Sequence, residues 1–318
     1  MVEQITVREA LLDDARPICM LFRSRIPVWQ RLTASGSVES LPYDSLTVYE
    51  RWTHGGPWMS IETAAIALGR LLNGVGLALV AERRGEIVGY LEAYPGYEPA
   101  PFGGHLHLAH LVTGGAAGPD AEIADSLLRR AGDVARHLPD KRLTVSLPSE
   151  TGDDAQFYRQ RGFAPLARVS RYLVPSKAGQ GFYKVTEHTR SSVDQIDGML
   201  MAFGRTESAS MLWESVWVSV WEVIPQLAQR GISRMKLDAS GHGVLICAQP
   251  VPHDPRIVDL WGWSARPMNP VLLTALRDWA HREKYHALRL IVDSETAGLF
   301  GTDAESDPFS RITFALQV

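Results

Sequence analysis

The chain has 318 residues and a mass of 35.2 kDa, about twice the size of a typical domain, so two domains are expected. Hydrophobic residues make up 45% and charged residues 21%, a composition typical of globular proteins with ample core material. The net charge of −4 argues against nucleic-acid binding through a broad basic face, and the two cysteines, Cys19 and Cys247, exclude a disulfide framework and a multi-cysteine metal site.

The first half of the sequence alternates strand and helix signals. Residues 5–7 alternate apolar and polar side chains, as a strand does, and Asp13 or Asp14 can cap the helix that follows. In chain order, the pattern then predicts a helix over 61–72, a hairpin over 77–82 and 87–93 around Gly85, a strand over 105–113, a helix over 121–136, a strand over 142–147, a helix over 154–161 and a closing strand over 163–174.

No segment is typical of export or of a membrane span. Residues 1–14 are acidic and lack the apolar core of a signal peptide. The most apolar stretch, residues 61–81, is interrupted by Arg70, Asn73, Gly74 and Gly76, which is too broken for a span of about 20 apolar residues. We therefore expect a cytoplasmic protein with reduced cysteines and no membrane partner.

The second half of the sequence repeats the pattern of the first. Residues 174–181 are polar and rich in helix breakers, as a linker is. Five later segments then match five earlier ones in the same order: 183–187 and 5–9, 235–248 and the hairpin at Gly85, 272–280 and 127–135, 289–292 and 142–145, 311–316 and 168–173. This predicts a tandem duplication with domains at 1–175 and 182–318. Two unrelated α/β domains are the alternative.

Residues 153–163, DDAQFYRQRGF, carry the most specific motif. They resemble the late helix and turn of the GNAT (GCN5-related N-acetyltransferase) superfamily, where an aromatic pair precedes a basic residue and Gly-Phe. Residues 78–93 resemble that family's second and third strands, and residues 5–15 its first strand and helix start. The resemblance covers residues 4–174, with the second half as a more diverged copy. It implies an α/β (α+β) fold of two GNAT-like domains, each a mixed, mostly antiparallel sheet flanked by helices.

The resemblance also implies an activity, the transfer of an acetyl group from acetyl-CoA to a primary amine by direct attack. In the family the co-substrate lies between the fourth and fifth strands, and N–H groups at the start of the next helix hold its diphosphate. The positions that correspond in this sequence are Leu111, Val112, Thr113, Gly114, Gly118, Ala121, Glu122, Ile123 and Ala124.

The sequence departs from the family pattern at this loop. Pro119 stands where the family has Arg or Gln, and Glu122 stands where it has glycine. A carboxylate beside a diphosphate is unfavourable by about 1 kcal/mol. Gly114, Gly115 and Gly118 can form either a displaced anion nest or only a turn. Residues 264–270, before the corresponding helix of the second half, contain no glycine, so we expect that copy to be catalytically silent.

These departures keep a second interpretation open. A GNAT-fold protein that binds a ligand or acts as a scaffold, without catalysis, is the alternative to the enzyme. A thioester other than acetyl-CoA is a third possibility. The sequence identifies neither the acceptor, a small-molecule or peptide amine, nor the oligomeric state.

Three residues are candidate catalytic groups. The resemblance aligns Tyr158 with the tyrosine that protonates the departing thiolate, although a packing role is equally compatible with the sequence. His105 and His107 alternate with leucines, so both face one side of their strand and one is a candidate base, whereas His110 is expected to point to the other side. A polar strand face or a core position explains them equally well. No carboxylate or cysteine nearby completes a metal set, so no metal is predicted.

Other side chains have simpler explanations. Glu92, Glu150 and Asp153 lie at expected strand ends, where they can bind a substrate ammonium or, more simply, face solvent. Trp213, Trp217 and Trp221 recur every four residues on an expected helix, which is typical of packing in a core or domain interface.

Overall fold

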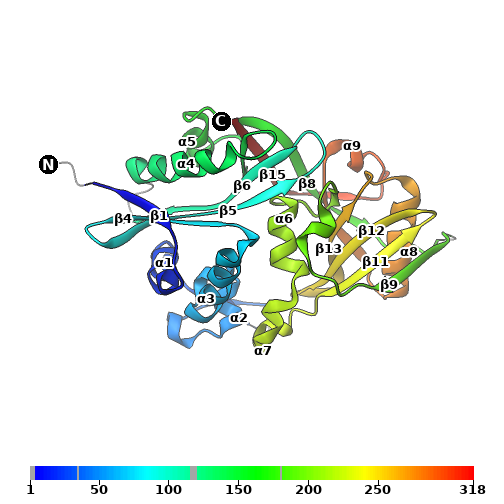
Figure 1. Ribbon diagram of the computed structural model, residues 1–318. Coiled ribbons are helices and arrows are strands. Elements are labelled where there is room, and N and C mark those ends of the chain that lie inside the picture. The colour runs from blue at the N-terminus through cyan, green and yellow to red at the C-terminus, as the bar shows by residue number, and fades with distance from the viewer. Residues whose placement is uncertain (1–3, 34–35, 115–119, 180) are drawn as a thin grey trace.

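The structure of the chain, a computed structural model, describes residues 4–33, 36–114, 120–179 and 181–318 (Figure 1). In this part of the chain, thirteen strands form one large sheet and two short strands form a separate hairpin. The strands of the large sheet are β1 (Thr6–Glu9), β4 (Leu77–Arg83), β5 (Glu86–Tyr97), β6 (Gly104–Thr113), β7 (Arg142–Leu147), β8 (Ala164–Pro175), β9 (Tyr183–Glu187), β10 (Leu200–Phe203), β11 (Ser233–Ala239), β12 (His242–Val251), β13 (Asp254–Ser264), β14 (Ala287–Val292) and β15 (Glu305–Gln317). The separate hairpin pairs β2 (Gln30–Leu32) with β3 (Val38–Ser40).

Helices cover the sheet on both faces. They are α1 (Ala15–Arg23), α2 (Val48–Trp52), α3 (Ile61–Arg70), α4 (Ala121–Ala135), α5 (Asp153–Arg159), α6 (Ala209–Leu212), α7 (Pro225–Ala228), α8 (Pro270–Arg282) and α9 (Ser294–Ala297). Over the N-terminal strands, α4 and α5 lie on one face and α1 to α3 on the other (Figure 1). On α4, Ile123, Leu127, Ala131 and Ala135 recur every four residues and are all buried, so one side of the helix packs on the sheet.

The mixed, mostly antiparallel sheet with flanking helices confirms the fold class predicted from the sequence. The predicted strand over 142–147 coincides with β7, and the predicted helix over 121–136 differs from α4 by one residue. The predicted hairpin joins β4 to β5. Its two turn residues, Arg84 and Gly85, have φ of 56° and 79°, the left-handed pair that matches the twist of a hairpin.

The order of strands in the sheet is the same from either edge. From one edge it is β1-β4-β5-β6-β7-β15, and from the other it is β9-β11-β12-β13-β14-β8. In each series only the fourth and fifth strands pair in parallel, β6 with β7 and β13 with β14. The two halves of the chain therefore have the same topology.

The closing strands of the two halves exchange places at the centre of the sheet. The last strand of the chain, β15, pairs with β7 of the first half, while β8 pairs with β14 of the second. Ile312 and Phe314 of β15 are buried in the core under α4, and Val174 of β8 is buried in the core of the second half. Each core is therefore completed by a strand of the other half.

The tryptophans at positions 213, 217 and 221 are packing residues, as predicted. Trp213 and Trp217 are fully buried and stack with their ring centroids 4.4 Å apart, and Trp221 packs on Trp52 of the first half. The prediction of one continuous helix is wrong. After α6 the backbone forms a π turn, in which the Val218 N–H donates to the Trp213 carbonyl, and it then continues as a separate 3₁₀ turn over 219–223.

Cys19 and Cys247 are both buried. Among the described residues, no helix has both the length and the apolar character needed to cross a bilayer.

Candidate active site

The candidate site lies where β6 and β7 separate. These parallel strands pair only from His105 opposite Arg142 to Leu108 opposite Val145. Beyond that point β6 continues to Thr113 and, among the described strands, pairs only with β5. Its other edge therefore presents backbone N–H and C=O groups that no described strand satisfies.

The four strand positions predicted to contact the co-substrate are found at this edge. Leu111 and Val112 lie on the stretch of β6 without a second partner and are half-buried. Thr113 ends the strand, and its hydroxyl accepts a hydrogen bond from the Asp120 N–H at 2.8 Å. The Gly114 N–H donates to the Val88 carbonyl, which extends the pairing with β5 by one residue.

A β-bulge on β6 changes the direction of the side chains that follow it. On β5, Glu92 pairs with His110 while its neighbour Ala93 pairs with Leu108, which leaves Ala109 as the extra residue. His110 therefore lies on the same face as the two histidines before it. The prediction that it points to the other side is wrong, because strict alternation along a strand makes no allowance for a bulge.

The N-terminus of α4 is capped by a carboxylate of the chain itself. One Asp120 oxygen accepts hydrogen bonds from the N–H groups of Glu122, at 3.1 Å, and Ile123, at 3.3 Å. Arg83 lies 3.4 Å from the Asp120 carboxylate and 3.7 Å from that of Glu122. Two of the N–H groups predicted to hold a diphosphate thus already hold an anion.

The remaining positions predicted at this turn differ in accessibility. Ala121 is exposed, whereas Ala124 is fully buried and donates its N–H to the Asp120 carbonyl at 2.9 Å. Gly118 lies outside the described residues. As it stands, with the Asp120 carboxylate on its free N–H groups, the described part of this turn does not fit a diphosphate.

Tyr158 lies on α5 beside the strand separation. Its ring is buried and meets Phe157 and Phe163 edge-on, each with centroids 5.1 Å away. Burial raises the pKa of the phenol above its ordinary value, and the carboxylates of Asp154 and Glu207 raise it further. The phenol therefore carries its proton at neutral pH, as an unperturbed tyrosine does, and the raised pKa makes it a weaker acid than a free phenol.

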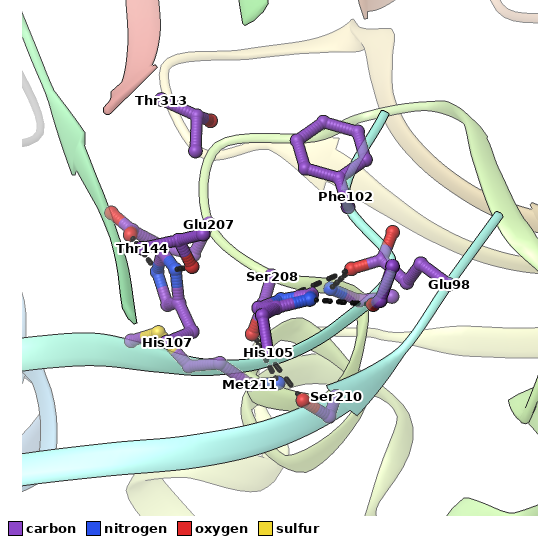
Figure 2. Close-up of polar contacts among 12 residues, drawn as sticks. Glu98, Phe102, His105, His107, Thr144, Glu207, Ser208, Ser210, Met211 and Thr313 are labelled. Carbon is purple, nitrogen blue, oxygen red and sulfur yellow. Dashed lines mark hydrogen bonds and ion pairs between the residues drawn. The ribbon is translucent and has the colours of Figure 1, made fainter. Parts of the chain in front are cut away.

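His105 and His107 lie on one face of β6, as predicted, and are 0% and 1% exposed. The His107 imidazole lies between two partners, with Nδ1 3.0 Å from the Thr144 hydroxyl and Nε2 2.9 Å from a Glu207 carboxylate oxygen (Figure 2). His105 Nδ1 lies 2.9 Å from the Gly103 carbonyl, and burial lowers the pKa of His105 to about 4. His105 is consequently a neutral core imidazole, and His107 is bonded at both nitrogens.

A buried ion pair beside these histidines joins the two halves of the chain. Arg205, on the loop after β10, pairs with Glu98, which follows β5. Glu98 also accepts a hydrogen bond from the Ala209 N–H at 3.2 Å, and the Arg205 guanidinium lies 3.7 Å from the centre of the Phe102 ring. Sequence reasoning missed this pair and Glu207, because charged residues about a hundred positions apart leave no pattern in a single sequence.

The three carboxylates expected at strand ends lie in different environments. Glu150 is half-buried and pairs with exposed Arg168, and Asp153 is exposed at the start of α5, as the solvation interpretation predicts. Glu92 is only 3% exposed. The expectation of a solvated strand end is wrong there, because β5 continues to Tyr97 and places Glu92 in its middle.

The second half contains the same separation of parallel strands, but the space is filled. β13 and β14 pair at three positions, and beyond them β10 pairs with β13 instead. The Gly204 N–H then donates to the Ile291 carbonyl of β14 at 2.7 Å. The Phe203 ring covers Gly262 so closely that a Cβ there would lie 2.2 Å from it. β10 thus occupies the space between the two parallel strands, which favours a silent second copy.

Comparison with known proteins establishes the fold. No protein-family model matches the sequence, and no match was found among curated proteins. Among solved structures, a GCN5-related N-acetyltransferase from Anabaena variabilis superposes with a TM-score of 0.62 at 10% identity, over 99% of this chain and 73% of that one. Eis1 from Mycobacterium abscessus gives 0.55 at 12% identity, over 99% and 73%, and a GCN5-related N-acetyltransferase from Kribbella flavida gives 0.55 at 10%, over 98% and 71%. The chain therefore has the fold of the GCN5-related N-acetyltransferases.

Proposed function

We propose that the chain is an N-acetyltransferase, with its site in the first half, that moves the acetyl group of acetyl-CoA to a primary amine. The observation that carries this proposal is the unpaired edge of β6 beyond Leu108. An extended molecule with amide groups, such as the pantetheine arm of acetyl-CoA, can hydrogen-bond to such an edge as an added strand does. The GNAT fold supports the same assignment.

Tyr158 is the residue to which we assign proton transfer. Acetyl-CoA supplies a thioester, whose sulfur needs a proton when the acetyl group leaves. The Tyr158 phenol carries a proton at neutral pH, as any tyrosine with a pKa of about 10 or higher does, so it can pass that proton to the thiolate. His105 and His107, the predicted bases, are less suited to accept a proton, because one is buried with a low pKa and the other is bonded at both nitrogens.

The α4 N-terminus favours a second candidate function. A diphosphate and the Asp120 carboxylate compete for the same N–H groups, and like charges at this distance repel. A protein that has the GNAT fold but binds another ligand, or acts as a scaffold without acetyl transfer, does not need free N–H groups at the α4 N-terminus.

The domain division stays part of the proposal. We infer a tandem duplication with GNAT-like domains at 1–175 and 182–318, and the matching strand order from the two edges of the sheet supports it. A cytoplasmic location and a small-molecule or peptide amine as the acceptor also stay predictions.

Calorimetric titration of the folded protein with two ligands tests the function. Acetyl-CoA carries the diphosphate, and S-acetylpantetheine has the same thioester arm without it. We expect both to bind, with similar affinity if Asp120 excludes the diphosphate from its usual place. Heat from neither ligand at millimolar concentration excludes the enzyme and leaves the scaffold. Where binding is found, a thiol reagent then measures transfer to added amines, with little background because both cysteines are buried.

A further inference from the structure

A cavity of about 50 Å³ lies between the two halves of the chain, on the α1–α3 face of the sheet. Its polar and aromatic walls include Glu92, Tyr94 and His110 from β5 and β6, Arg70 from α3, and Glu214 and Trp221 from the second half. His110 belongs to the stretch of β6 that lacks a second strand partner. The cavity therefore borders the stretch of β6 to which the proposed function assigns the thioester.

The two carboxylates in the cavity wall are compensated differently. Glu214 is paired with Arg70, whose Nε donates to Oε2 at 2.7 Å. Glu92 forms no ion pair with any described residue. Its two oxygens accept hydrogen bonds from neutral groups only. Oε2 accepts from the Trp58 indole N–H at 2.7 Å and from the Tyr90 hydroxyl at 3.4 Å, and Oε1 accepts from the Tyr94 hydroxyl at 2.7 Å. The cavity wall therefore contains one buried carboxyl group that no cationic side chain among the described residues pairs with, and a cationic ligand would supply that partner.

The acceptor positions that remain in the cavity match a primary ammonium group. A carboxylate oxygen accepts two hydrogen bonds, and Glu92 Oε1 receives only one from the described residues. Arg70 bonds a single oxygen of Glu214, which leaves Oε1 of that side chain. His110 also lines the cavity, and an imidazole ring has one acceptor nitrogen when it is neutral. Three acceptors around a small space suit the three N–H donors of R–NH₃⁺, whereas a quaternary ammonium has none.

The dimensions of the cavity limit what enters it. A cavity with a volume of about 10 to 15 Å³ is needed to hold one water molecule. The cavity accordingly holds an ammonium group with one or two methylene groups, and the rest of a larger amine would extend outside. Trp52 and Trp221, whose ring centroids lie 4.8 Å apart, form an aromatic wall that suits an alkyl ammonium.

We propose that this cavity between the halves is the acceptor site and takes the ammonium group of a small, unhindered primary amine, held by Glu92. The assignment to an acceptor rests on the proposed function. Transfer requires the amine to lose a proton before it attacks, and His110 is placed to take that proton from nitrogen and become an imidazolium. Glu92 is a binding residue in this scheme and transfers no proton.

Binding is tested on the full chain without acetyl-CoA, by NMR. The indole N–H of Trp58 is bonded to Glu92, so its resonance reports on the carboxylate directly, and Trp58→Phe assigns it. We expect n-propylammonium to shift this resonance saturably. N,N,N-trimethylpropylammonium and 1-propanol should bind weaker by about tenfold or more, the factor that corresponds to about 1.4 kcal/mol. Equal responses to all three probes, or no response to any, would overturn the proposal.

Variants separate the cavity from a general charge effect. Glu92→Gln keeps one acceptor for Trp58 and one donor for Tyr94 while it removes the charge, and it should abolish the response. Glu62→Gln makes the same change at an exposed position of α3 outside the cavity wall and should leave the response intact. Ala67→Val fills the cavity without a change of charge and should also abolish binding of n-propylammonium. This variant therefore tests whether the amine binds in the cavity even if Glu92→Gln does not fold. Undiminished binding in Ala67→Val overturns the proposal.

Failure of the amine-site proposal can be distinguished from failure of the acetyltransferase proposal. Calorimetry with acetyl-CoA tests the donor site, and the Trp58 titration tests the cavity. If acetyl-CoA binds and n-propylammonium does not, the cavity is not the acceptor site although the transferase proposal stands. If only n-propylammonium binds, the cavity is an amine site, and the transfer reaction, with the acceptor role that rests on it, is excluded.

Discussion

The Nε2 atom of His107 lies 2.9 Å from a carboxylate oxygen of Glu207, a residue one hundred positions later in the chain. The other imidazole nitrogen lies 3.0 Å from the Thr144 hydroxyl, and the ring is 1% exposed. His107 therefore links β6 and β7 to the loop after β10, and so links the two halves. Because both ring nitrogens of His107 have partners within the protein, its role is structural rather than catalytic.

His107→Phe should destabilise the protein by about 2 kcal/mol, because a ring of similar size leaves the Thr144 hydroxyl and the Glu207 carboxylate without this partner. Denaturant unfolding measures the loss. A double-mutant cycle with Glu207→Gln should give a coupling of about 1 kcal/mol. A variant of unchanged stability that has lost transfer activity would instead assign His107 to the chemistry.

Tyr158→Phe should lower kcat for acetyl transfer by about 100-fold and leave KM for acetyl-CoA unchanged, because the phenol donates a proton without contributing to ground-state binding. The ring still fills its place between Phe157 and Phe163, so stability should change little. Steady-state kinetics measures the effect. Tyr172→Phe, the same change on β8 beside Phe300, is the matched control and should have wild-type kinetics. An unchanged kcat in Tyr158→Phe means that water supplies the proton.

Asp120→Asn should tighten acetyl-CoA binding by about fivefold, because it removes about 1 kcal/mol of repulsion while an asparagine still caps the helix. Affinity for S-acetylpantetheine, which lacks the diphosphate, should not change. Titration calorimetry compares the two ligands. Asp133→Asn, near the other end of α4, makes the same charge change at a distance from the turn. Equal tightening by both variants would mean that the diphosphate does not lie at the α4 N-terminus.

Local patterns in the sequence predicted most elements of the fold. The alternation in β7, the four-residue spacing in α4 and the Arg84-Gly85 turn are each determined by neighbours in the chain, so a single sequence reveals them. The exchange of β8 and β15 could not be predicted in this way. Both strands have the same alternation, and the choice between neighbouring strands is made by tertiary packing.

The candidate site was predicted less completely than the fold, for three physical reasons. The bulge at Ala109 has no glycine or other local signal, yet it reverses His110. The anion at the α4 N-terminus is the carboxylate of Asp120, a position at which the family pattern specifies no residue type. The partners of His107 and Glu98 come from the other half of the chain, at separations that leave no periodic trace.

The stability of the protein should fall between pH 6.5 and about 4 in part because of His105. Burial lowers the pKa of this imidazole to about 4 in the folded state, while the unfolded chain takes up the proton near 6.5. Between these values the unfolded state binds more protons, so the free energy of unfolding decreases as the pH falls, by up to about 3 kcal/mol from this residue. Denaturant unfolding of wild type and His105→Gln over this range isolates the contribution. Parallel pH profiles for the two proteins would contradict it.

Gly262→Ala should destabilise the protein by about 1 to 3 kcal/mol, because its new methyl group would lie 2.2 Å from the Phe203 ring, which covers this glycine. Gly69→Ala is the matched control. It adds a methyl group on α3 with no atom within 4 Å, and in a helix it should stabilise by up to about 1 kcal/mol. The double variant Gly262→Ala/Phe203→Leu should recover part of the loss, since the smaller side chain gives the methyl group room. Thermal unfolding of the four proteins measures these differences. If Gly262→Ala is as stable as wild type, the Phe203 ring does not pack tightly on Gly262.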